Sequence, residues 1–290
     1  MNLEESTKIV TTNTPKKFLT AGTNRIKLRP LTKASIVVRV TLMSLLLLTL
    51  YGFLTFNYAG VGLFEGIWTM LGNFKTMFVN THFKHFTFGT ALYQVLITLG
   101  LALLTTLFGA IIALFLALFA AKNLGSSYVS NAIKGFVAFI RAVPTVLWVL
   151  IFAVSAGLGS VAAIVGMTFH SVGYLIKAYS ESFEELDDGV IEALRGSGAN
   201  WWQVVFQAVL PSSMTYLISW TFLRFEINFG VAIAMGAAAG AGGIGYEMFM
   251  ASGFYLDLKE VGAITYFILT FAILLEIFAT KIKGRLKVRM

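Results

Sequence analysis

Long, nearly uncharged apolar runs recur along this chain, and they constrain its fold more than any other feature. A transmembrane helix needs about twenty mainly apolar residues, and the first such run covers residues 36–56. Apolar residues make up 57% of the 290 positions and charged residues only 12%. An ordinary soluble domain could not keep so much apolar surface away from water. We therefore predict an all-α integral membrane protein.

Six membrane spans are predicted from the apolar runs. They cover residues 36–56, 90–120, 133–153, 159–176, 212–233 and 261–280, with Arg141 and Pro144 inside the third and Pro211 just before the fifth. Residues 57–87 are less apolar and contain Trp68 among other aromatics, which favours an outside segment with an interfacial helix. We expect short turns elsewhere, except for a longer polar loop at about 178–211.

The basic residues gather near the two ends of the chain. Because cytoplasmic flanks of membrane spans are rich in Lys and Arg, we expect both termini in the cytoplasm, which requires an even number of spans. Residues 1–35 are predicted as a cytoplasmic N-terminal tail and residues 282–290 as a basic cytoplasmic tail. These basic cytoplasmic flanks of the membrane spans account for the net charge of +8, so no nucleic-acid partner is expected.

The sequence offers little for catalysis or for metal binding. It has no Cys, so disulfides, zinc–thiolate sites and thiol nucleophiles are excluded. Its three histidines are His82, His85 and His170, and no carboxylate pattern supports the first two. We expect no metal site, no Ser/His/Asp catalytic arrangement and no enzymatic activity.

A glycine-alanine run at 236–245 could be mistaken for a nucleotide-binding loop. It lacks the preceding strand and the Lys-Ser/Thr pair that give such loops their function. Between two spans, small residues favour close backbone packing, a re-entrant turn or a hinge beside a translocation path. The candidate packing or hinge residues are Gly240, Gly242, Gly243 and Gly245.

The polar loop at 178–211 contains the most informative pattern. Six acids lie between 181 and 192. The carboxylates of Asp187 and Asp188 can cap a helix that begins near Gly189, Gly198 can end that helix, and an apolar helix can follow from Trp201. The acids alone would fit a solvated loop between two spans. A helix, a glycine turn and a second helix together would instead form a protruding surface that a partner protein can bind.

Residues 192–211 resemble the coupling loop that ABC importer permeases present to their ATPase subunit. The resemblance rests on Glu192-Ala193, on Gly198 six residues after the Glu, and on Leu210-Pro211. From about residue 88 onward the chain resembles type I ABC importer permeases of the phosphonate type. The matching segments are FIRAVP at 139–144, Leu147-Trp148, His170-Ser171, EELD at 184–187, RFEIN at 224–228 and GAGGIG at 240–245. The chain departs from the family pattern at Leu194, Ala208, Phe229-Gly230 and 236–239.

The resemblance implies a type I ABC importer permease fold with six transmembrane helices. Residues 36–87 would form the first helix and outside segment, and 88–281 the five-helix ABC transmembrane type-1 domain, with a cytoplasmic coupling loop at about 178–211. Glu192, Ala193, Gly198, Leu210 and Pro211 would contact a separate ATPase that binds ATP and Mg, so this chain itself would hold no cofactor. The other implied partners are an extracytoplasmic solute-binding protein and a second permease copy in a homodimer, in a bacterial plasma membrane.

The implied cargo is phosphonate or a related phosphorus oxyanion such as phosphite or phosphate. Arg141, Arg224, Glu226 and Asn228 are polar residues within predicted spans, where ionisable groups are costly and usually functional or paired. The arginines could guide an oxyanion through paired hydrogen bonds. Alternatively, Arg224 could form a structural pair with Glu226 or with another helix, and Arg141 could lie near the inner interface, where snorkelling lowers its cost. Another small solute such as an amino acid, or an ATPase-independent channel or secondary transporter, stays open as an alternative.

Overall fold

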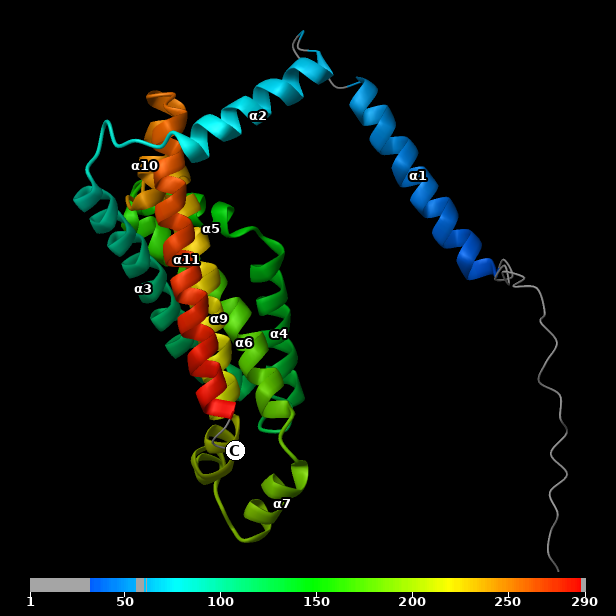
Figure 1. Cartoon of the computed structure of the whole chain (residues 1–290). Coiled ribbons are helices and arrows are strands. Elements are labelled where there is room, and N and C mark those ends of the chain that lie inside the picture. The colour runs from blue at the N-terminus through cyan, green and yellow to red at the C-terminus, as the bar shows by residue number, and fades with distance from the viewer. Residues whose placement is uncertain (1–31, 56–59, 61, 288–290) are drawn as a thin grey trace, which may run out of the picture. The chain divides into compact units, whose positions relative to one another are not determined.

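A computed structural model describes residues 32–55, 60 and 62–287, and every regular element within these ranges is a helix (Figure 1). The chain divides into two compact units, residues 1–62 and 63–290. The first unit contains α1 (Lys33–Thr55), which buries none of its residues. A helix that is apolar on all sides fits a lipid environment. Residues 1–31, most of the predicted N-terminal tail, lie outside the described residues.

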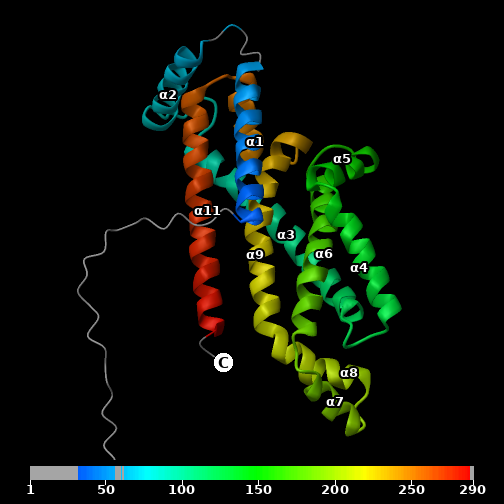
Figure 2. The same ribbon diagram turned by 90° about the vertical axis from the view of Figure 1, so that its right-hand side faces the viewer.

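The second unit is a bundle of helices with short connections. In chain order these are α2 (Leu63–Val79), α3 (Phe88–Ala120), α4 (Ser127–Ala142), α5 (Thr145–Ala156), α6 (Ser160–Glu184), α7 (Asp188–Gly196), α8 (Trp201–Val204), η1 (Val205–Val209), α9 (Leu210–Ala239), α10 (Ile244–Phe249), η2 (Met250–Phe254) and α11 (Leu258–Lys287). Helices α3, α6 and α9 pack against one another, and α11 packs against α2 and α9. Helix α7 lies at one end of this unit, and α5 and α10 lie at the other (Figures 1 and 2).

In the part of the chain that the structure describes, five stretches of helix are long and apolar enough to cross a membrane: α1, α3, α6, the continuous segment Trp201–Ala239, and α11. Helices α4 and α5 supply a sixth span if they are counted together, although they meet at an angle of 91°. With 17 residues, α2 is shorter than a span. Counted in this way, the described residues contain the six spans that the sequence predicts, one of them broken.

The prediction of an unbroken third span at 133–153 is wrong. Helix α4 ends at Ala142, Val143 adopts an extended conformation, and α5 begins after Pro144. Proline has no backbone N–H and forces the residue before it out of the helical region, so the chain turns here. As a result, α5 packs against α6 instead of continuing along α4.

Three predicted helix ends also need correction. Helix α6 continues to Glu184, two turns beyond the predicted end at residue 176. The fifth span does not begin after Pro211, because helix runs without interruption from Trp201 to Ala239. The π-helix Val205–Val209 lies immediately before α9. Pro211 has no backbone N–H to donate, and the wider turn of the π-helix accommodates the missing hydrogen bond. At the C-terminus, α11 continues through most of the predicted basic tail.

Helix α3 shows the packing pattern of a membrane protein. Its buried face carries mainly small residues, including Ala91, Ala102, Thr105, Gly109, Ala113 and Ala117. Its exposed face carries large apolar residues, including Leu103, Leu107, Phe108, Ile111 and Phe115. Small residues let helix backbones approach closely, and large ones are suited to contact with lipid. The helix therefore turns its bulkiest side chains away from its neighbours.

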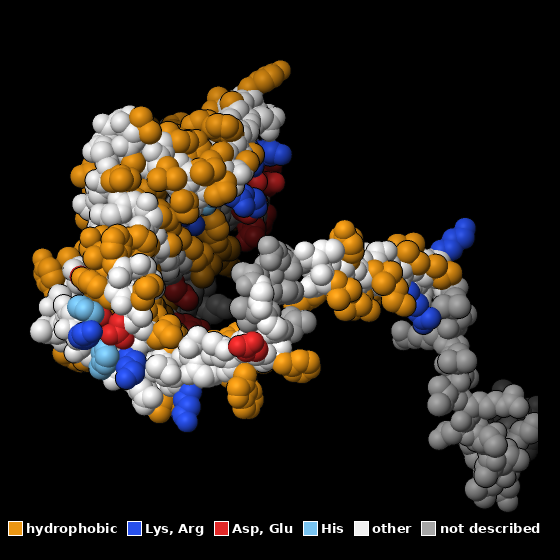
Figure 3. All heavy atoms as spheres, turned by 90° about the horizontal axis from the view of Figure 1, so that it is seen from above, with side chains coloured by type: hydrophobic (Ala, Val, Ile, Leu, Met, Phe, Trp, Pro, Cys, Tyr) orange, Lys and Arg blue, Asp and Glu red, His pale blue; other side chains and the backbone are white. Residues whose placement is uncertain are grey.

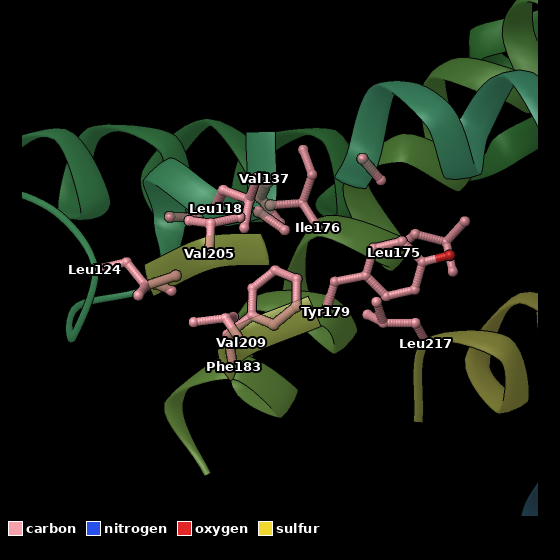
Figure 4. Close-up of a cluster of buried hydrophobic side chains, with 14 of the residues drawn as sticks. Leu118, Leu124, Val137, Leu175, Ile176, Tyr179, Phe183, Val205, Val209 and Leu217 are labelled. Carbon is pink, nitrogen blue, oxygen red and sulfur yellow. The ribbon is translucent and has the colours of Figure 1, made fainter. Parts of the chain in front are cut away.

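The largest buried apolar cluster lies near α7 (Figure 4). It includes Leu118 of α3, Val137 of α4, Phe183 of α6 and Val209 just before α9. Ile191 of α7 belongs to the same cluster and is only 2% exposed. This burial fixes α7 against the ends of the long helices.

Candidate functional site

Helices α7 and α8 form a helix–turn–helix at the end of the bundle. The Asp187 carboxylate accepts a hydrogen bond from the backbone N–H of Gly189 at 3.0 Å and caps α7. Gly198 has a φ of +88°, which favours glycine and ends the helix. Asn200 and Gln203 form a reciprocal capping box at the start of α8. The predicted helix, glycine turn and helix are therefore confirmed.

This pair of helices is attached to the loop between α3 and α4. Arg195 Nη2 donates to the carbonyl of Asn123 at 3.2 Å, and Trp201 Nε1 donates to the carbonyl of Leu124 at 2.8 Å. At the end of α6, Glu184 accepts hydrogen bonds from the Lys122 backbone N–H and from Lys134 Nζ, both at 2.7 Å. These contacts join α7 and α8 to the ends of three long helices.

The five residues predicted to contact an ATPase fall on different elements. Glu192 and Ala193 are exposed on α7, and within the described chain the Glu192 carboxylate has no polar partner. Gly198 is exposed in the turn. By contrast, Leu210 is the first residue of α9 and packs against the buried cluster, while Pro211 beside it is exposed.

Arg224 lies at the centre of a buried polar cluster between α3, α6 and α9. Its Nε donates to Ser171 Oγ at 3.0 Å. One turn along α9, Asn228 Nδ2 donates to Thr106 Oγ1 at 2.9 Å and to Ser171 Oγ at 3.1 Å. Arg224 is 3% exposed and Asn228 is fully buried. The sequence named both residues, and the structure brings them together.

The guanidinium of Arg224 has no ion-pair partner among the described residues. Its Nη2 is buried without a hydrogen bond, and its Cζ lies 5.1 Å from the ring centre of Tyr174. The predicted alternative of an Arg224–Glu226 ion pair is wrong, because residues two apart on a helix point in different directions. A buried cation without a counter-charge is costly, and a bound anion would compensate it.

A second arginine and a histidine belong to the same part of the sequence resemblance. Arg141 is exposed in the last turn of α4, and His170 lies in α6 immediately before Ser171. His170 Nδ1 is buried without a hydrogen-bond partner. Sequence reasoning missed the roles of Ser171 and Thr106. Ser171 could have been found from its place beside His170, whereas Thr106 carries no signal in a span that contains several threonines.

The glycine-alanine run forms a tight turn between α9 and α10. Gly240, Gly242 and Gly243 have φ values of +61°, +79° and +76°. Just after them, the Ile244 N–H donates to Thr98 Oγ1 of α3 at 3.0 Å. Gly245 packs so closely against α9 that a Cβ there would lie 1.8 Å from the carbonyl oxygen of Ile233. Close packing is therefore found at Gly243 and Gly245, whereas nothing lies within 4 Å of a Cβ placed on Gly240.

The expectation that no carboxylates support His82 and His85 is wrong. His82 Nε2 lies 2.9 Å from Asp257 Oδ2, and His85 Nδ1 lies 2.6 Å from Glu260 Oε2. Each pair is 175 residues apart in the chain. No local pattern in the sequence could reveal partners at that separation.

Residues 109–288, which include the α7–α8 pair and also Ser171, Arg224 and Asn228, match the family described as "binding-protein-dependent transport system inner membrane component". The match covers more than half of the chain. This chain belongs to that family. Members of the family are transport components, which agrees with the expectation of a role other than enzymatic catalysis.

Two relatives of this inner membrane component carry names that specify a cargo. The phosphate-import permease protein PhnE of Mycolicibacterium smegmatis is 30% identical over 65% of this chain and 35% of that protein. The phosphite transport system permease protein PtxC of Stutzerimonas stutzeri is 31% identical over 66% of this chain and 69% of that protein. The matched segment thus spans about a third of the first relative and about two thirds of the second.

The fold of this inner membrane component is also found in a solved transporter. The inward-facing MetNI methionine ABC transporter contains a chain that superposes with a TM-score of 0.59 at 22% identity. The superposition covers 68% of this chain and 95% of that one. This chain therefore has the type I ABC importer permease fold that its sequence resembles.

Proposed function

We propose that this chain is the transmembrane permease subunit of an ATP-driven importer and that its cargo is a phosphorus oxyanion such as phosphonate, phosphite or phosphate. The observation that carries the cargo proposal is the buried Arg224, which has no carboxylate partner and a free Nη2. Guanidinium groups bind phosphorus oxyanions through paired, charge-assisted hydrogen bonds. The names of the phosphate and phosphite permeases point to the same chemistry.

Helix α7 is the proposed contact for a separate ATPase that binds ATP and Mg. Its Glu192 and Ala193 are exposed, while its opposite side is fixed by Ile191 and Arg195. A movement of α7 would therefore displace the loop between α3 and α4 and the end of α6. Such a link lets ATP binding on the partner shift the equilibrium between inward-open and outward-open states.

A second copy of the chain is the proposed partner within the membrane. Along α9, Glu226, Gly230, Ala234 and Ala238 follow one another at intervals of four residues, and the last three are exposed. Small residues at this spacing allow two helices to approach closely, which supports a symmetric dimer with the pathway between the copies. An extracytoplasmic solute-binding protein would deliver the cargo. Both termini would lie in the cytoplasm of a bacterial cell.

The test is uptake of labelled phosphate, phosphite and methylphosphonate by cells with and without this chain, in the presence of its ATPase and binding protein. We expect uptake of at least one of the three to require the chain and to fall about tenfold or more in Glu192→Ala, since this exposed residue would contact the ATPase. The matched control is Glu185→Gln, which alters an exposed carboxylate near the end of α6.

Unchanged uptake in Glu192→Ala, with the ATPase still required, would remove α7 as the coupling contact. Uptake that needs the chain but no ATPase would indicate a channel or secondary transporter. If the assembled importer carried none of the three anions, a different small solute, such as an amino acid, would replace the phosphorus oxyanion.

A further inference from the structure

Two segments that are far apart in the chain meet at the end of the bundle opposite α7. One is the connection between α2 and α3, which carries His82 and His85, and the other is residues 255–260 at the start of α11. Histidine, acidic and basic side chains gather on this face (Figure 3). Ligand atoms of His85, Asp257 and Glu260 all lie within 4.8 Å of one another.

Contacts with neighbouring groups hold the side chains of His85 and Glu260 in place. Glu260 is fully buried, and its Oε1 accepts hydrogen bonds from the backbone N–H groups of Lys84 at 3.1 Å and His85 at 2.7 Å. The His85 ring stacks on Tyr255 with 3.9 Å between ring centres. Metal sites depend on such supporting contacts, because they orient the ligands before the ion arrives.

Asp257 is positioned by an unusual stretch of backbone. The π-helix Met250–Phe254 precedes it, and Leu256 has a φ of +50°, which is uncommon for a residue other than glycine. Asp257 Oδ1 accepts hydrogen bonds from the backbone N–H groups of Lys259 at 3.1 Å and Glu260 at 3.3 Å, which fixes the carboxylate at the start of α11. A pocket of about 310 Å³, lined by His82 and Asp257 among other residues, exposes these two side chains to solvent.

We propose that His85, Asp257 and Glu260 bind a divalent transition-metal ion of the zinc class, with His82 available as a fourth ligand. Imidazole nitrogen and carboxylate oxygen are common zinc ligands, and four ligands complete a tetrahedral site. The sequence alone predicts no metal site here. The ion would tie the segment before α3 to the start of α11.

The spacing and the charge of this cluster suit a metal ion. Ligands about 2 Å from a zinc ion lie within about 4 Å of one another, so the observed separation requires only small side-chain rotations. Two carboxylates lie here beside two imidazoles, which are neutral when they bind metal. A divalent cation would balance both negative charges at once.

The experiment uses the full chain with any subunits that copurify, carrying a tag without histidines, stripped of metal and titrated with Zn²⁺. We expect one zinc ion per chain, with affinity reduced tenfold or more in His85→Ala and in Asp257→Asn. Zinc should raise the thermal unfolding midpoint of the wild type and not that of either variant. Glu185→Gln, at the far end of the bundle, is the matched control and should bind as the wild type does.

Cobalt(II) gives a second readout, because a four-coordinate ion absorbs visible light strongly. We expect this absorption in the wild type and in Glu185→Gln and its loss in His85→Ala. Asp257→Asn preserves size and serves if His85→Ala does not fold. Equal zinc binding in wild type and variants, or none in the wild type, would overturn the site and leave two metal-free histidine–carboxylate pairs. Neither result depends on transport activity.

Discussion

Gly245→Ala should prevent the chain from reaching its folded state. The added Cβ would lie 1.8 Å from the carbonyl oxygen of Ile233 and 2.9 Å from its Cα. These atoms belong to the backbone of α9, so no side-chain rotation can relieve the overlap. Overpacking in a rigid interior typically costs about 1–3 kcal/mol, and a clash with backbone should exceed about 3 kcal/mol.

The measurement is the yield of monodisperse chain after detergent extraction, together with its thermal unfolding midpoint. Gly100→Ala is the matched control, because Gly100 also lies in a helix but has nothing within 4 Å of its Cβ position. That control should fold normally, since alanine is the better helix former. A folded Gly245→Ala protein with an unchanged midpoint would show that α10 does not pack on α9 this closely.

Arg224→Met should lower kcat/KM for oxyanion uptake about 10- to 100-fold, since hydrogen bonds to a charged group are worth about 1.5–3 kcal/mol. The same substitution should leave the thermal midpoint unchanged or raise it. Methionine has a similar length, and the substitution removes the cost of burying a cation that lacks a counter-charge. Transport kinetics and thermal unfolding of the same preparations test both parts.

Arg224→Lys separates charge from geometry. It keeps the positive charge but loses the planar donor pair, so uptake should fall less than in Arg224→Met. If Arg224→Met lowered the thermal midpoint and left uptake unchanged, Arg224 would have a structural role through Ser171 and Tyr174, and the oxyanion proposal would lose its main support.

Features encoded within one segment could be predicted from the sequence. The apolar runs locate the spans, and Asp187 and Gly198 mark the ends of α7, because hydrophobicity and capping act over a few residues. The break at Pro144 follows an equally local rule, but the apolar run around it concealed the turn. The sequence does not predict the end of α6, because this helix continues past Lys177 into polar residues. Its last residue, Glu184, accepts hydrogen bonds from Lys122 and Lys134.

Features that depend on the folded chain could not be predicted in this way. His82 and Asp257 meet only because α2 packs on α11. Arg224 donates to Ser171 of α6, and Asn228 beside it donates to Thr106 of α3, so the sequence shows the charge but not these hydroxyl groups. The charged residues of the candidate site could therefore be predicted from the sequence, but the residues that surround them in the fold could not.

The small inner face and bulky outer face of α3 have a practical consequence for handling this protein. Lipid tails are as apolar as the side chains they touch, so the helices gain little from leaving lipid for one another. Close fit between backbones then holds the bundle together. Detergents with short chains, which can insert between helices, should loosen it at temperatures where long-chain detergents preserve it, even though both shield the same surface from water.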